Sequence, residues 1–111
     1  MVSTSPKQFE IYWADLNPTK GSEMKKVRPC IVVSPDVMNN ALKTVLVVPL
    51  ISTIVDWPFR TTITSSGKLS SAACDQIRAI AKERLGSKIG SLKPAEQRAV
   101  LHILQEIFAT N

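Results

Sequence analysis

A polar, basic loop at residues 17–27 leads through Arg28 and Pro29 into Cys30-Ile-Val-Val33, an apolar run typical of a buried strand. This order delivers a guanidinium to the start of a core strand. Two interpretations stay open. Either Arg28 caps a strand edge beside solvated lysines, or the loop is an anion-binding lip with a rigidly held guanidinium beside it. The lysines concerned are Lys20, Lys25 and Lys26.

Asp75, in Cys74-Asp-Gln-Ile-Arg78, is the only carboxylate that the sequence places inside an apolar, strand-like stretch. Burial would raise its pKa and suit it to proton transfer, whereas a pair with Arg28 or Arg78 would lower the pKa and make the residue structural. Arg78 follows three residues later and is expected on the opposite face of a regular strand. It is therefore a candidate for binding phosphate rather than a partner of Asp75.

The other residues whose side chains could take part in catalysis or ligand binding form no cluster in the sequence. His102 is the sole histidine and is expected on the surface or at an interface of a terminal helix. No His/Cys group has metal-ligand spacing and no glycine-rich phosphate loop occurs, so we predict no metal and no cofactor. Trp57 and Phe59 either stack on unpaired bases or form a lid on the fold.

Composition narrows the function classes. A chain of 111 residues is expected to form one domain, and 44% hydrophobic with 21% charged residues is an ordinary globular composition. The net charge of +5 suits a polyanionic partner. Two cysteines without metal spacing predict buried thiols in a reducing compartment. No apolar run approaches about 20 residues and no leader is visible, so we expect a cytoplasmic protein without a membrane span.

The elements that must position these residues are mainly strands. We expect strands at residues 9–14, 29–34, 43–51, 60–64 and 69–80, with Phe9, Ile11 and Trp13 on the buried face of the first. Residues 36–42 are turn-like, 65–68 form a hairpin turn, and 82–85 form a single helical turn. Pro49 lacks an amide donor and is expected at a strand edge or a bulge. These strands predict a small, strongly curved barrel.

The chain ends in an expected amphipathic helix of about four turns that begins at Pro94. Its large apolar residues recur at helical spacing: Val100, Leu101, Ile103, Leu104, Ile107 and Phe108. This is more apolar surface than one small barrel needs, which favours a partner, although the helix could equally lie across the barrel.

Four ordered motifs resemble the MazF/PemK family of bacterial toxins, which are ribonucleases that cut messenger RNA. They are Ile11-Tyr-Trp-Ala-Asp-Leu-Asn-Pro-Thr-Lys-Gly-Ser-Glu23, Arg28-Pro29, Asp75-Gln-Ile-Arg78 and Lys82-Glu-Arg-Leu85. The similarity runs from about Phe9 to Phe108. It implies an α+β, mainly β fold: a small SH3-like barrel of about five to seven strands with a C-terminal amphipathic helix. It also implies a single toxin domain over residues 1–111, with residues 1–7 flexible, that assembles as a homodimer.

The resemblance also implies a metal-independent reaction in which the neighbouring 2′-hydroxyl of RNA attacks the phosphate. Such a reaction needs a base, an acid for the leaving 5′-oxygen, and positive charge on the phosphorane. Arg28 matches the catalytic arginine of the family, and Asp75 matches an aspartate assigned as the base in some members. A family threonine falls at Ile51, which cannot transfer a proton, so the adjacent Ser52 and Thr53 become candidates.

Further departures and contacts follow from the same resemblance. A histidine of some relatives falls at Ser22 and an arginine falls at Ala73, while Glu23 matches an important acidic residue. We expect single-stranded RNA in a basic groove that a cognate antitoxin peptide also occupies. The expected RNA-binding residues are Lys20, Ser22, Glu23, Lys25, Lys26, Phe59 and Arg78.

Two rival hypotheses remain open. The CcdB toxins share the expected fold and act on DNA gyrase without cleaving nucleic acid, and Ile51 in place of threonine keeps this class in view. A catalytically dead relative that only binds RNA is the other, and its binding would weaken steeply with salt.

Overall fold

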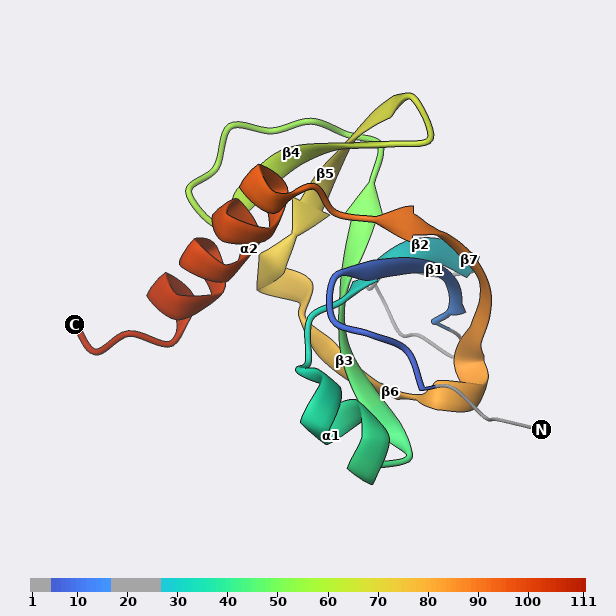
Figure 1. The fold of residues 1–111 in the computed structure, drawn as a ribbon. Helices are drawn as coiled ribbons and strands as arrows, with labels where there is room; N and C mark the ends of the chain where they lie inside the picture. Colours follow the sequence, from blue (N-terminus) through green and yellow to red (C-terminus); the bar gives the residue numbers. More distant parts are fainter. Residues whose placement is uncertain (1–4, 17–26) are drawn as a thin grey trace.

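β3 (Thr44–Ile51) is the strand around which the sheet is built in the computed structural model, which describes residues 5–16 and 27–111. From Val45 to Leu50 every residue is apolar and all but Leu46 are buried, as expected for a strand covered on both faces. The remaining elements are β1 (Glu10–Asp15), β2 (Val27–Val32), α1 (Asp36–Ala41), β4 (Arg60–Ser65), β5 (Lys68–Ala73), the 3₁₀ turn η1 (Cys74–Gln76), β6 (Arg78–Ala81), the 3₁₀ turn η2 (Lys82–Arg84), β7 (Leu85–Ser91) and α2 (Pro94–Ile107) (Figure 1).

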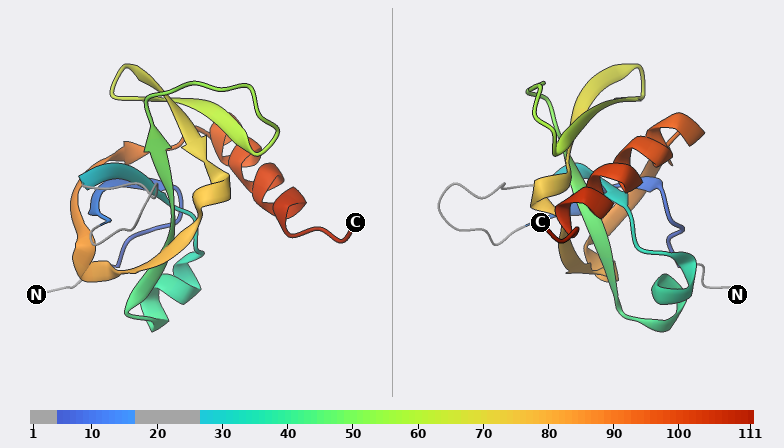
Figure 2. Two further views of the ribbon diagram at one scale, coloured as in Figure 1. Left: turned by 180° about the vertical axis from the view of Figure 1, so that it is seen from behind. Right: turned by 90° about the vertical axis from the view of Figure 1, so that its left-hand side faces the viewer.

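The described strands form one antiparallel sheet in the order β4-β5-β3-β2-β1-β7, and β6 also pairs with β3. Val47 pairs with Val32 of β2 and with Arg78 of β6, so β6 lies on the edge of β3 away from β2. Figure 2 shows the sheet curling into a half-barrel, with α2 lying outside the curl. The predicted mainly β fold of five to seven strands with a C-terminal helix is confirmed.

The two faces of this sheet carry separate hydrophobic cores because neighbouring residues of each central strand point in opposite directions. The first core lies under α2 and the β4–β5 hairpin; its buried members include Ile11, Ile31, Val48, Leu50, Ile63, Cys74, Val100 and Leu104. The second core fills the curl; its buried members are Ala14, Leu16, Cys30, Val32, Val45, Val47 and Ile80. The sheet is therefore a shared wall between two cores.

The strand predicted over residues 69–80 is interrupted. Leu50 pairs with Ala72 and Val47 pairs with Arg78. Between these two pairs the chain advances three positions along β3 but six positions along the partner segment. The three extra residues form η1, where the amide of Ile77 donates to the carbonyl of Cys74. Asp75 therefore lies on an exposed turn rather than inside a strand.

Trp13 was expected on the buried face with Phe9 and Ile11, but it is 43% exposed. The pairing of β1 with β7 shifts register on both sides of Tyr12, and burial passes to Ala14 and Leu16 on the other face. The prediction failed because one face of β1 contributes to the first core and the other face to the second core, at different ends of the strand.

Three further elements differ from expectation. β2 begins at Val27, two residues early, so Arg28 lies within the strand. Residues 36–41 form helix α1 rather than a turn, and buried Asn39 donates to the carbonyls of Pro6 and Ser34. β7 was not predicted because its glycines and polar residues lack strand propensity.

The remaining elements match their predictions. Ser66 and Gly67 have φ angles of 52° and 75°, which is the mirror-image turn that closes a two-residue hairpin. Helix α2 begins at Pro94, and the Glu96 carboxylate accepts from the amide of Lys93 at 2.9 Å. Pro49 is buried in β3. On the side of β3 away from β2, it lies between Val47, which pairs with β6, and Leu50, which pairs with β5.

Candidate active site

Arg28 lies in β2 opposite Ala14 of β1, which places its side chain on the face that carries Cys30 and Val32. Its Nε is buried and has no hydrogen-bond partner among residues 5–16 and 27–111. Leaving a buried guanidinium donor unpaired is costly, and a phosphate oxygen would satisfy it. An anion bound at Arg28 would satisfy this donor, while the loop that would form the anion-binding site lies outside the described residues.

Arg78 lies on the same face of the sheet as Arg28, but it comes from β6 on the other edge of β3. It opens β6 opposite Val47, whose side chain belongs to the second core. Burial raises the pKa of the Cys30 thiol to about 12, and the positive charges of Arg78 and Arg28 act in the opposite direction. Two arginines predicted to meet phosphate therefore converge on one face, close to Cys30.

Ile51 ends β3 directly opposite Ser71 of β5. Ser71 is 1% exposed, and its hydroxyl makes no hydrogen bond within the described residues. Sequence analysis did not select Ser71, because a serine in a strand carries no signal until its cross-strand neighbour is known. The position that would hold a family threonine thus lies beside an unsatisfied hydroxyl.

A cavity of about 300 Å³ opens where β2 begins and β3 ends, and we call it the hairpin pocket. It is lined by Arg28, Ile51 and Ser52, by Trp13 of β1, and by the tip of the β4–β5 hairpin. Ser52 thus shares a cavity with Arg28. Thr53 is exposed and does not line it.

Asp75 is paired, but with neither Arg28 nor Arg78, the two arginines considered from the sequence. Its two carboxylate oxygens accept from Nε and Nη2 of Arg60 at 2.9 and 3.1 Å. These hydrogen bonds lower the pKa of Asp75, against a smaller opposing effect of burial. The partner prediction was wrong because η1 moves Asp75 out of the strand and toward β4. A carboxylate held ionised in this way is a weaker base.

Phe59 lies in the same cluster as that ion pair. Its ring centroid is 5.4 Å from that of Trp57, and the Arg60 guanidinium carbon is 4.7 Å from the Trp57 centroid. Phe59 is half-buried against the first core. Arg60 and Ser65 are the two ends of β4, about 17 Å apart for an extended strand, so the structure does not bring Phe59 to the hairpin pocket.

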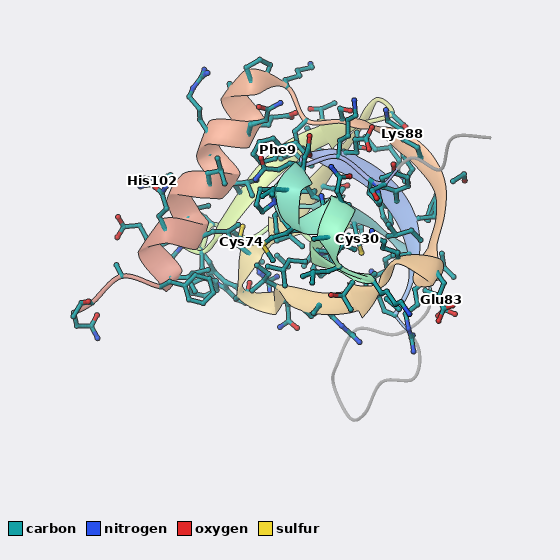
Figure 3. The ribbon with its side chains drawn as sticks, turned by 60° about the horizontal axis from the view of Figure 1, so that its bottom comes forward. Phe9, Cys30, Cys74, Glu83, Lys88 and His102 are labelled. Atoms are coloured by element: carbon teal, nitrogen blue, oxygen red, sulfur yellow. The ribbon has the colours of Figure 1, made fainter. Side chains whose placement is uncertain are left out.

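Several predicted residues lie outside the described part of the chain, and nothing in the structure places them. They are the loop residues Lys20, Ser22, Glu23, Lys25 and Lys26. His102 is exposed on α2, and Figure 3 shows its side chain pointing away from the sheet. Within residues 5–16 and 27–111, no group of three or more His, Cys, Asp or Glu side chains that could hold a metal ion occurs.

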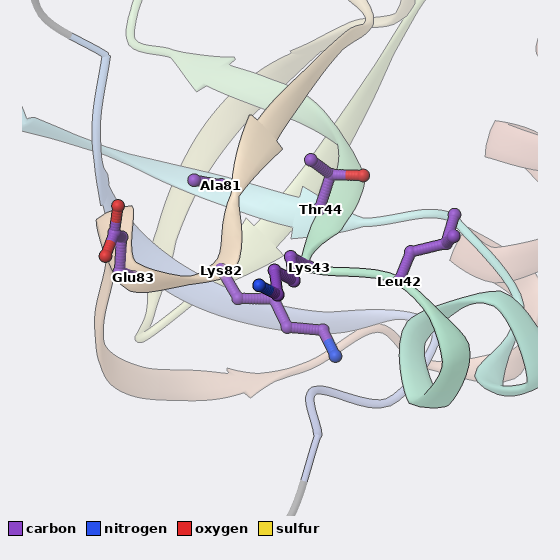
Figure 4. Close-up of a pocket in the computed structure, with 6 residues that line it drawn as sticks. All are labelled: Leu42, Lys43, Thr44, Ala81, Lys82 and Glu83. Atoms are coloured by element: carbon purple, nitrogen blue, oxygen red, sulfur yellow. The ribbon is translucent and has the colours of Figure 1, made fainter.

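A larger cavity, of about 440 Å³, lies at the far end of β3. Figure 4 shows its lining of Lys43, Thr44, Lys82 and Glu83 with two apolar neighbours. None of the predicted catalytic residues lines it, so we place the candidate active site at Arg28. No helix in the described residues is long and apolar enough to cross a membrane.

Comparison with known proteins connects this geometry to a family. Residues 7–108 match the family model for the PemK-like, MazF-like toxin of type II toxin-antitoxin system. The chain is 32% identical over 96 residues to the endoribonuclease toxin MazF of Escherichia coli strain K12, which covers 86% of both chains.

Solved structures share the fold. MazF from Deinococcus radiodurans superposes with a TM-score of 0.85 at 20% identity, covering 97% of this chain and all of that one. An endoribonuclease in complex with its cognate antitoxin, from a mycobacterial species, gives a TM-score of 0.81 at 21% identity and covers 96% of this chain and all of that one.

Proposed function

Because this chain belongs to the PemK-like, MazF-like family of toxins of type II toxin-antitoxin systems, we propose that it cuts single-stranded messenger RNA at a short recognition sequence. The protein is an endoribonuclease. We further propose that the reaction needs no metal ion, that the whole chain is one toxin domain, and that it acts in the cytoplasm.

The observation that carries this proposal is the buried Nε of Arg28, which has no hydrogen-bond partner within the described part of the chain and lies beside a cavity shared with Ser52. In the proposed reaction the 2′-hydroxyl oxygen attacks phosphorus, and the bond from phosphorus to the 5′-oxygen breaks. The products are a 2′,3′-cyclic phosphate and a 5′-hydroxyl. Arg28 stabilises the charge that develops on the phosphorane oxygens, which is often the largest single contribution to such catalysis.

The proton-transfer roles are proposed for Ser52, Thr53 and Asp75. Ser52 has the better position, since it lines the hairpin pocket with Arg28. Asp75 would act as an ionised carboxylate, but its two hydrogen bonds to Arg60 favour the structural alternative. Ile51 supplies no proton, so chemistry at this site depends on its polar neighbours.

Substrate contacts are proposed for several further residues. Arg78 lies near Arg28 across Cys30 and is assigned to a neighbouring phosphate. Phe59 and the loop residues Lys20, Ser22, Glu23, Lys25 and Lys26 are assigned to RNA binding from the family resemblance. We also propose that the cognate antitoxin inserts its C-terminal peptide into this groove, since a structural relative was solved with its antitoxin.

The test is incubation of the purified protein with a long single-stranded RNA in excess EDTA, followed by mapping of the new ends. We expect discrete cuts that carry 5′-hydroxyl groups. Arg28→Ala should slow cleavage at least about a hundredfold if the guanidinium stabilises the transition state. Arg98→Ala removes an exposed arginine of α2 and is the matched control.

A loss of less than about tenfold for Arg28→Ala would overturn the assignment of this arginine. Intact RNA from folded, antitoxin-free protein would overturn the metal-free ribonuclease. The comparisons give no support to a toxin that acts on DNA gyrase, and none of the relatives described above is named as one.

A further inference from the structure

We propose that the hairpin pocket binds one nucleobase of the RNA, stacked on the indole of Trp13, next to the phosphate that Arg28 holds. Trp13 would then help to determine which sequence is cut. The inference rests on the proposed function, because it adds a base-binding subsite to the site of cleavage.

Trp13 is an exposed aromatic residue in the middle of a strand. Its neighbours Ile11 and Ala14 are 1% exposed, whereas Trp13 is 43% exposed. In the sheet it stands opposite Pro29, one position from Arg28. Helix α2 covers the first core but does not line the hairpin pocket, and the indole lines that pocket with 43% of the residue exposed among the described residues. A large flat ring presented in this way is the usual platform for an unpaired base.

The walls of the pocket suit a nucleotide. Lys68 supplies positive charge, and no acidic residue within residues 5–16 and 27–111 lines the cavity. Ser65, Ser66 and Ser70 of the hairpin provide hydroxyl groups that can donate to or accept from the polar edge of a base. The volume of about 300 Å³ lies at the small end of ligand pockets and fits one nucleotide rather than several.

The pocket also adjoins the proposed chemistry. Arg28, Ile51 and Ser52 line it, and they are the residues around which the cleavage site is built. The guanidinium of Arg28 points to the face of the second core, while Trp13 and Pro29 belong to the opposite face. A strand of RNA crossing the start of β2 would therefore place a phosphate on one side of the sheet and the flanking base on the other.

Trp57 is a matched control within the same chain. It is 46% exposed, close to the value for Trp13, but its ring is already engaged by the Arg60 guanidinium and tilted against Phe59. It does not line the hairpin pocket. The chain has two tryptophans, so replacing either one leaves a single fluorescent reporter.

The experiment uses the full chain with Trp57→Phe or Trp13→Phe and titrates a random-sequence 2′-O-methyl RNA decamer, which lacks the 2′-hydroxyl nucleophile. The indole retained in Trp57→Phe should be quenched as RNA binds. The indole retained in Trp13→Phe lies against Phe59, outside the hairpin pocket, and should be quenched less than the indole retained in Trp57→Phe. RNA should still bind to this variant, as followed by anisotropy of a labelled decamer. Equal quenching of both indoles, or quenching of Trp57 alone, would overturn the proposal.

Cleavage provides the second arm. Trp13→Ala should weaken decamer binding about five- to a hundredfold, the range for loss of one stacked base, and should relax base preference at one position beside the cut. Trp13→Phe should stay within about threefold of the unmodified protein, since phenylalanine also stacks. If Trp13→Ala does not fold, the two fluorescent variants still decide.

The two proposals fail separately. Quenching of the Trp13 fluorescence without any RNA cleavage would support the base subsite and contradict the proposed reaction. RNA cleavage at an unchanged recognition sequence by folded Trp13→Ala would contradict the base subsite and support the proposed reaction.

Discussion

At the scale of single residues, the two hydrogen bonds between Arg60 and Asp75 are the clearest guide to what Asp75 does. The Arg60 side chain is 10% exposed and that of Asp75 is 28% exposed, so the pair is partly withdrawn from water. Removing one member of such a pair leaves the other charge without a partner. Loss of the ion pair would therefore lower the free energy of unfolding, whereas loss of a general base would lower the rate of RNA cleavage.

We expect Asp75→Asn to destabilise the fold by about 1–3 kcal/mol, as for hydrogen bonds to charged groups, and to change cleavage by less than about tenfold. Urea unfolding and a cleavage assay measure the two effects. Asp56→Asn, at an exposed carboxylate four residues before Arg60, should stay within about 0.5 kcal/mol. A hundredfold loss of rate at unchanged stability would instead make Asp75 the base.

The pH dependence has a definite sign. The pKa of Asp75 is lowered in the folded protein from the ordinary value of 3.8. The stabilisation from its ionised form is therefore complete above that value and is lost as pH falls through the folded pKa. The difference in stability between the unmodified protein and Asp75→Asn should accordingly shrink below about pH 4 and stay constant near neutrality.

Sequence alone placed Arg28 at the start of a core strand, and the structure keeps it there. The partner of Asp75 could not be predicted in the same way. Arg60 lies 15 positions away, and the two side chains meet only because three unpaired residues of η1 redirect the chain. Short-range patterns do not reveal an insertion of this kind, since its composition resembles that of the strands beside it.

At the scale of elements, sequence periodicity predicted the helices and strands with regular apolar patterns. It missed the strand that is stabilised mainly by pairing with its neighbour. Helix α2 and strand β3 carry long, uniform apolar patterns and were predicted well. Strand β7 contains glycine, serine and lysine, and it exists because β1 pairs with it. Its attachment includes the Lys88 ammonium, 2.7 Å from Glu10, whose other oxygen accepts from the Tyr12 hydroxyl.

The hairpin turn offers a test with an internal control. Gly67 has φ of +75° and open space where a Cβ would lie, so alanine there would meet only backbone strain. We expect Gly67→Ala to cost about 1–2 kcal/mol in thermal or urea unfolding. Gly90 has equally open space without the left-handed conformation, and Gly90→Ala should be neutral or slightly stabilising. Equal effects at both positions would contradict the turn geometry.

At the scale of the whole molecule, apolar surface remains outside both cores. Phe108, at the end of α2, is 72% exposed, and Ile107 and Trp57 are also exposed. Such residues gathered near one helix end suit contact with a second copy of the chain, in line with the homodimer that we propose for this family member.

We expect the protein to sediment as a dimer and Phe108→Asp to sediment as a monomer with its thermal unfolding little changed. Val37, on α1, is 75% exposed and gives a control of equal exposure. Val37→Asp should remain a dimer because α1 lies away from α2 (Figure 1). A dimer that survives Phe108→Asp would place the interface elsewhere.

The two cysteines supply a built-in measure of cooperativity. Cys74 is buried in the first core and Cys30 in the second, and both are 0% exposed. Burial raises their pKa values to about 11 and about 12, so neither thiol reacts while its core is closed. If the shared sheet couples the cores, both thiols should be alkylated at one common rate as the protein opens. Two different rates would identify which half of the molecule opens first.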